Sequence, residues 1–143
     1  MRLTRHAACA AVLALGACGY VPPARLASIS LAADADANAR HATAIDIVFV
    51  YSKAAMEKMP TDAAQWFDKR DDLVKAQPTE MEVKPVKLAI GRSTTVTPPE
   101  HAGTLLGVYS YANYIPDGAT YCNLSKFVHA TIHLSSSGVA CSQ

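Results

Sequence analysis

Hydrophobic and polar residues alternate along several short segments of this chain, and the alternation predicts β-strands. In residues 26–32, Ile29 and Leu31 fall on one face of an extended chain, whereas Ser28 and Ser30 fall on the other. Such alternation is typical of a strand with one face in the core and one face in water. The segment therefore predicts a half-buried strand early in the chain.

The segment 43–51, TAIDIVFVY, predicts the strongest strand, because it is rich in β-branched and aromatic residues. Ile47 and Phe49 share one face, and Val48 and Val50 occupy the opposite face. Apolar residues on both faces indicate a strand that is covered on both sides. We therefore expect a central strand here.

A helical pattern interrupts the strands at about residues 53–76. Its first turns end at Pro60, after which Thr61 is the expected N-cap of a second helix. Apolar residues then recur at spacings of three to four, which places Trp66 on the buried face, and Pro78 ends the pattern. The region predicts a helical insertion between strands.

The rest of the chain returns to strand patterns, at 81–90, 93–97, 105–114, 127–134 and 139–141. Pro85 restricts the first of these strands to a sheet edge or a strand start, because proline donates no ladder hydrogen bond. The alternation in 127–134 turns Val128 inward, and His129 and His133 outward. Roughly seven short strands with one helical excursion predict a mostly β chain, folded as an antiparallel sandwich.

The first 17 residues have the layout of a secretory signal peptide. Arg2 and Arg5 form a basic head, and an apolar stretch follows at 7–15. This stretch of about ten residues is too short to cross a bilayer core of roughly 30 Å as a helix. Residues 18–24, which contain two prolines, read as a short tether, so the folded domain is expected at 25–143.

The leader ends in Leu15-Gly16-Ala17-Cys18, which resembles the lipobox of bacterial lipoproteins. In that motif the cysteine is acylated and becomes the new N-terminus, so Cys18 is the expected site of lipid attachment. The alternative is an ordinary signal peptide, cut near Ala17, that leaves a free thiol. By the same resemblance, Gly19 in place of an aspartate implies export to the outer membrane, with the domain anchored by lipid on its periplasmic face.

Cysteine usage supports an oxidising compartment. Of the four cysteines, Cys9 leaves with the leader and Cys18 carries the lipid. Cys122 and Cys141 remain, and an even pair in an exported domain predicts a disulfide. The alternative is two unrelated buried thiols.

Composition and motifs argue against several functions. The net charge is +1, with 13 basic and 12 acidic residues, so the chain has no electrostatic footprint for nucleic acid. It has no Gly-x-Ser-x-Gly elbow and no glycine-rich phosphate loop, so we expect no enzyme, no cofactor and no small-molecule substrate.

Two groups of residues offer weaker hypotheses. His129 and His133 could bind a metal with His101 or a carboxylate, but the absence of an HExxH context favours a solvated strand face. Tyr109, Tyr111 and Tyr114 could form a binding platform, although tyrosines that fill a sandwich core give the same pattern.

With these elements in place, the chain resembles the outer-membrane lipoprotein family of type VI secretion, called TssJ. In that family a first strand leads through an Asp-x-Asn loop into a valine-rich second strand that ends in tyrosine. Asp36-Ala37-Asn38 and the segment 47–51 hold those places here. Trp66-Phe67-Asp68 resembles the aromatic-bearing insertion of the family, and the segment 106–114 its later strand.

The resemblance implies a transthyretin-like sandwich with a structural role. A lipid would anchor the domain to the outer membrane, and its loops would bind the periplasmic part of the inner-membrane channel protein TssM. In the family, much of that contact comes from the connection between the first two strands. The polar residues of this connection are the candidate partner-binding residues: Asp34, Asp36, Asn38 and Arg40. The alternatives are a mobile, solvated loop and a periplasmic binding or inhibitor lipoprotein unrelated to secretion.

Overall fold

The computed structural model describes residues 19–115 and 120–143, so the predicted leader and Cys18 lie outside the described residues. The described chain forms β1 (Ser28–Ala33), a 3₁₀ turn (Ala37–Arg40), β2 (Thr43–Val50), α1 (Lys53–Met56), α2 (Ala63–Ala76), β3 (Met81–Leu88), β4 (Ser93–Val96), β5 (Gly107–Asn113), β6 (Tyr121–Asn123), β7 (His129–Ser135) and β8 (Gly138–Ser142). Within this part of the chain, no helix is long and apolar enough to span a bilayer.

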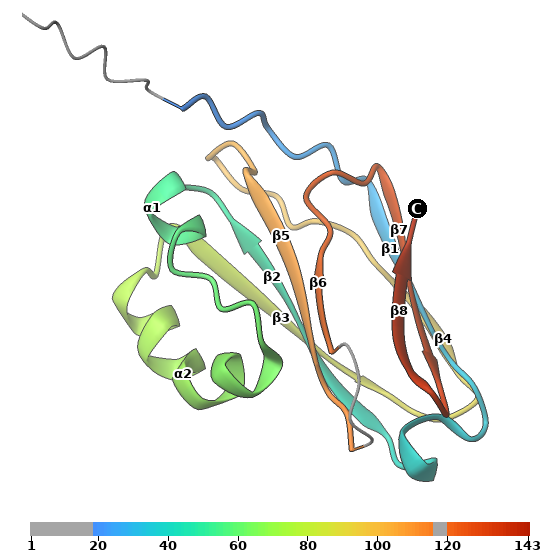
Figure 1. Cartoon of the computed structure of the whole chain (residues 1–143). Coiled ribbons are helices and arrows are strands. Elements are labelled where there is room, and N and C mark those ends of the chain that lie inside the picture. The colour runs from blue at the N-terminus through green and yellow to red at the C-terminus, as the bar shows by residue number, and fades with distance from the viewer. Residues whose placement is uncertain (1–18, 116–119) are drawn as a thin grey trace, which may run out of the picture.

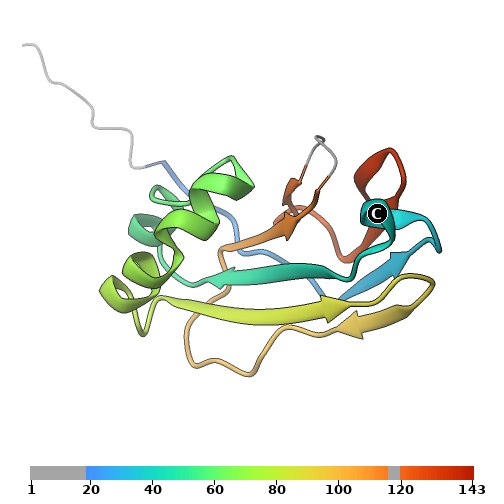
Figure 2. The same ribbon diagram turned by 90° about the horizontal axis from the view of Figure 1, so that it is seen from below.

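The strands form two packed sheets (Figure 1). One sheet has the order β4-β1-β7-β8 and the other the order β3-β2-β5-β6. The predicted sandwich with a helical insertion is confirmed, and both helices lie against the outer side of the second sheet (Figure 2). One pairing departs from the antiparallel prediction, because β1 and β7 run parallel. The structure also adds a strand, β6, that the sequence pattern did not predict.

The main core lies between the sheets and is almost entirely aliphatic and aromatic. Ile47 and Phe49 of β2 face it, each fully buried. Val48 and Val50 are equally buried on the opposite face, beneath the helices. The prediction of a central strand covered on both sides is therefore confirmed, and full burial of each such side chain contributes about 1.5–3 kcal/mol.

A buried charge docks α2 on its sheet. Asp46 is only 3% exposed, and its Oδ2 accepts a 2.9 Å hydrogen bond from Nε1 of Trp66. The same oxygen lies 3.1 Å from Nε of Arg70, so the carboxylate has two partners from one helix. The indole of Trp66 also stacks on Tyr111, with ring centroids 4.7 Å apart. The helix begins at Asp62, whose carboxylate accepts from the Gln65 N–H, rather than at the predicted Thr61.

The tyrosines of β5 belong to the core. Tyr109 and Tyr111 lie beneath the helical layer, 5% and 0% exposed. Burial raises the pKa of both phenols above the usual range. The tyrosines are therefore core residues, but Tyr109 and Tyr111 lie in the core between the helices and their sheet, and Tyr114 lies in the core between the two sheets.

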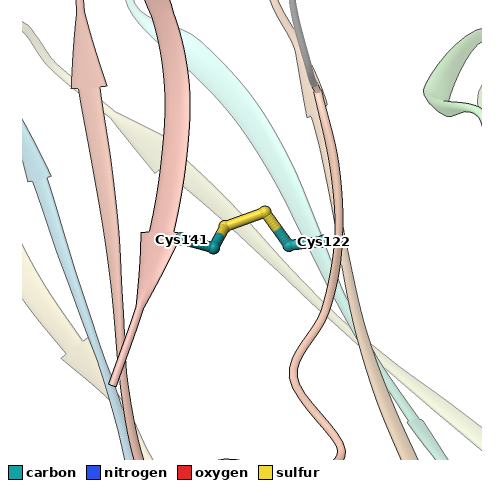
Figure 3. Close-up of a disulfide and its surroundings, with 2 residues drawn as sticks. All are labelled: Cys122 and Cys141. Atoms are coloured by element: carbon teal, nitrogen blue, oxygen red, sulfur yellow. A yellow bond between two sulfur atoms is a disulfide. The ribbon is translucent and has the colours of Figure 1, made fainter.

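The predicted disulfide between Cys122 and Cys141 joins the two sheets (Figure 3). Cys122 lies on β6 and Cys141 on β8, which are edge strands of different sheets. Cys141 pairs with Ile132 across the β7–β8 hairpin, as the sequence predicts. The bridge therefore links the two sheets along one side of the sandwich.

Two further predictions concern strand edges. Pro85 lies on β3, which is an edge strand, as predicted. Val128 was expected in the core but is 40% exposed. The reason is that β7 begins only at His129, and Val128 precedes it, where its carbonyl accepts the Ala27 N–H.

Candidate partner-binding site

The loop between β1 and β2, residues 34–42, lies at the end of the sandwich opposite the N-terminal segment (Figure 1). Strand β1 runs from the incoming tether towards this loop (Figure 1). The β7–β8 turn and the β3–β4 turn come to the same end, because the Asp34 N–H donates to the Leu134 carbonyl and the Asp34 carbonyl accepts from the Gly91 N–H. We call this the loop end, and the opposite one the tether end.

Asn38 forms the interior of the loop. It is 1% exposed, and its Nδ2 donates to Oγ1 of Thr43 at 3.0 Å. Its Oδ1 accepts the backbone N–H of Ile115 at 2.6 Å, from the chain that follows β5. The buried amide is therefore satisfied on both of its polar atoms, and it ties the loop to two neighbouring segments.

Tyr114 completes this network from the main core. Its hydroxyl accepts the Asn38 backbone N–H at 2.8 Å and donates to the carbonyl of Ser135. One phenol thus connects the β1–β2 loop, the end of β5 and the β7–β8 turn. Fully satisfied buried networks of this kind favour a single conformation over alternatives.

The tip of the loop adopts an uncommon backbone conformation. Asn38, Ala39 and Arg40 have φ values of 49°, 51° and 65°, a left-handed turn without glycine. This conformation costs roughly 1–2 kcal/mol for each residue with a Cβ, although asparagine tolerates it better. The network around Asn38 and Tyr114 offsets this strain and presents Ala39 and Arg40 to solvent.

The two histidines of β7 each contact a different side chain, one on β1 and one in the loop that follows it. Nε2 of His133 lies 2.9 Å from Oδ1 of Asp34, and Nδ1 of His129 lies 3.0 Å from Oγ of Ser28. His101, the third histidine of that hypothesis, stacks on Tyr51 with ring centroids 3.5 Å apart. Among residues 19–115 and 120–143, no group of three or more histidines, cysteines or carboxylates could hold a metal ion.

Known structures share this fold. Lip from Serratia marcescens, a membrane-bound component of the type VI secretion system, matches with a TM-score of 0.59 and 15% identity, over 85% of this chain and 98% of Lip. The type VI lipoprotein TssJ1 from Pseudomonas aeruginosa matches with a TM-score of 0.54 and 16% identity, over 85% of this chain and 96% of TssJ1. This chain has a TssJ-like fold.

A chain in the structure of the type VI protein TssM C-terminal domain from EAEC matches as well, with a TM-score of 0.54 and 12% identity, over 82% of this chain and 97% of that one. No family model and no curated protein sequence matches.

Within the TssJ-like fold, the four candidate partner-binding residues divide into two groups. Asp34, Asp36 and Arg40 are exposed at the loop end, where a partner could reach them. Asn38 is not available to a partner, because it is buried and its side chain bonds within the domain. Its expected role as a polar anchor is therefore replaced by a role in shaping the loop.

Sequence reasoning missed the residues that hold the loop in place. The sequence pattern places Tyr114 only among the tyrosines of a possible platform or core, and Thr43 only at the start of a strand. Asp46, which holds α2 on its sheet rather than the loop, was not singled out either. A signal existed for Asp46, since an aspartate inside TAIDIVFV is unusual in a buried strand. No local pattern marks Tyr114, because its partners Asn38 and Ser135 are 76 and 21 residues away.

Proposed function

We propose that this chain is a lipid-anchored scaffold of a type VI secretion membrane complex, which binds the periplasmic part of the channel protein TssM. The observation that carries the proposal is the placement of the loop end and the tether end at opposite ends of a TssJ-like sandwich. A lipid on Cys18 would hold the tether end at the outer membrane and direct the loop end into the periplasm. The proposed role involves no catalysis.

The loop end has properties that suit a specific partner. Its tip is fixed by a buried network, so little conformational entropy is lost when a partner binds. Its exposed residues include Asp36 and Arg40, which offer charges of both signs within a short segment. Strained backbone of the kind found at Ala39 is concentrated at functional sites. A chain of this fold in the structure of the TssM C-terminal domain supports TssM as the partner.

A binding measurement tests the proposal. The purified mature protein should bind the periplasmic part of TssM from the same gene cluster, measured by calorimetry. The double variant Asp36→Lys/Arg40→Glu should bind at least about tenfold more weakly, because exposed charges at an interface are reversed. Lys84→Glu on the exposed edge strand β3 is the matched control, and we expect unchanged affinity.

Unchanged affinity of the double variant would contradict the assignment of the loop. Failure of the unmodified protein to bind TssM at all would favour the alternative of a periplasmic binding lipoprotein unrelated to secretion. The anchor has a separate test, in which Cys18→Ser should move the domain from the outer-membrane fraction to the soluble periplasm. Retention of that variant in the outer membrane would exclude the lipid as the sole anchor.

A further inference from the structure

The tether end carries an apolar groove with a volume of about 690 Å³. We call it the tether-root groove. Part of its lining comes from the tether itself, through Val21 and Pro23, and part from Met56, Leu106 and Phe127 of the domain. The groove therefore lies where the tether meets the folded domain.

Two cationic side chains line the same groove. Arg25 and Lys126 are both exposed, and none of the described residues that line the groove is acidic. A third cation lies close to the tether, since a Cβ placed on Gly19 would be 3.7 Å from Nζ of Lys53. Lys53 also has Glu57 at 4.0 Å on the exposed surface of α1. The groove combines an apolar floor with positive charge at its rim.

Exposed apolar side chains extend this surface beyond the groove. Val128, which lines it, is 40% exposed, and Tyr20 on the tether is 83% exposed. Apolar and tyrosine side chains beside lysine and arginine are the combination that suits a membrane interface, where the apolar parts enter and the charges meet phosphates.

We infer that the tether-root groove and its cationic rim rest on the anionic phospholipid surface of the membrane. The inference rests on the proposed lipid anchor at Cys18. Cys18 is three residues from Val21 in the groove, and an extended chain spans at most about 3.6 Å per residue, so a lipid there keeps Val21 within about 11 Å of its attachment point. Arg25 and Lys126 line the same groove and would meet the lipid phosphates beside that point. The contact fixes the orientation of the domain and points the loop end away from the bilayer.

Lysine footprinting on the lipidated protein tests this contact. The mature protein is reconstituted by its own anchor into vesicles of phosphatidylcholine, or of phosphatidylcholine with phosphatidylglycerol, and flotation confirms attachment. A water-soluble amine acetylating reagent is added, and the modification rate of each lysine is measured by mass spectrometry. Lys84 and Lys87 on β3, which pair with Ile47 and Ala44 of β2 and do not line the groove, are internal controls.

We expect the rate at Lys126, relative to Lys84, to fall by about fivefold in the anionic vesicles, as the attraction of one lysine to such a surface implies. A Lys126-to-Lys84 rate ratio that is the same in anionic and in phosphatidylcholine vesicles, measured on attached protein, would overturn the inference while leaving the anchor intact. Equal protection in both lipids, increasing with protein density, would also overturn it, because it would indicate contact between copies. Failure to float in either lipid would overturn the anchor and the inference together.

A charge-reversal variant provides a second test, in which Lys84 and Lys87 of β3 remain as internal controls. In Arg25→Glu/Val128→Asp, both substitutions are at exposed positions, so we expect the variant to fold. The anchor should still float the protein, but the protection of Lys126 should be lost. The matched variant Lys75→Glu/Ala76→Asp, at exposed positions of α2, should keep it. Protection of Lys126 that survives in the first variant would contradict the inference.

Discussion

The two ends of this sandwich differ in what fixes their shape. At the loop end, directional bonds around Asn38 and Tyr114 hold a strained left-handed turn in one conformation. At the tether end, the chain is attached by a few backbone bonds, such as Ala24 N–H to the Leu105 carbonyl at 2.9 Å, and its surface is an apolar groove with cations. The difference suggests a specific protein partner at the first end and a non-specific lipid surface at the second.

The largest expected effect on stability comes from removing the disulfide, which lies between the two ends. Its removal serves as a reference for the predictions made at both ends. Replacing Cys122 and Cys141 by alanine should lower the free energy of unfolding by about 3 kcal/mol, because the bridge closes a loop of 19 residues in the unfolded chain. Chemical denaturation measures the loss. At temperatures where the variant remains folded, TssM binding and Lys126 protection should both persist. Loss of either would show that the ends depend on the bridge directly.

A smaller effect is expected when the network of the loop end is broken. Asn38→Ala should lower the free energy of unfolding by about 2 kcal/mol, because the Ile115 N–H and the Thr43 hydroxyl lose a buried partner. Asn38→Gly separates lost hydrogen bonds from backbone strain, since glycine accepts the φ of 49° without cost.

The matched control for this network is Asp36→Ala at a neighbouring exposed position, where we expect a change below about 0.5 kcal/mol. Both Asn38 variants should weaken TssM binding and leave Lys126 protection unchanged. Equal stability of Asn38→Ala and the unmodified protein would show that the network does not determine the loop.

The smallest expected effect is a gain in stability rather than a loss. Ala39→Gly should raise the free energy of unfolding by about 0.5–1 kcal/mol, because glycine adopts the φ of 51° without the Cβ clash that alanine suffers. Ala44→Gly, an exposed position in the regular strand β2, should instead destabilise the protein by a similar amount. Thermal unfolding of the pair distinguishes relief of strain from a general effect of glycine. A destabilising Ala39→Gly would contradict the strain at the tip.

The sequence predicted those parts of the fold that depend on local pattern. Period-two alternation located β2 and showed that both of its faces are covered, and spacing placed Trp66 on the buried face of α2. The two cysteines that remain after the leader and the lipid site predicted the Cys122–Cys141 bridge. The parallel pairing of β1 with β7 was not predictable in this way, because it joins segments about 100 residues apart through tertiary packing.

The candidate site was predicted only in part, for the same reason. The Asp-x-Asn loop was identified by resemblance, but the burial of Asn38 depends on Tyr114 and on the chain after it, which no pattern near the loop reveals. Similarly, Val128 continues the alternation of β7, yet it lies outside that strand and lines the tether-root groove. Alternation predicts which side of the sheet a residue faces, but it does not predict where the strand begins or ends.

The orientation of the domain is tested most directly by photo-crosslinking in the assembled envelope. A photoreactive amino acid is placed at His41, exposed at the loop end, or at Val128, exposed at the tether end, in the lipidated protein. After irradiation, the position at His41 should crosslink to TssM and the position at Val128 to phospholipid. Crosslinks to TssM from Val128, with none from His41, would contradict the account.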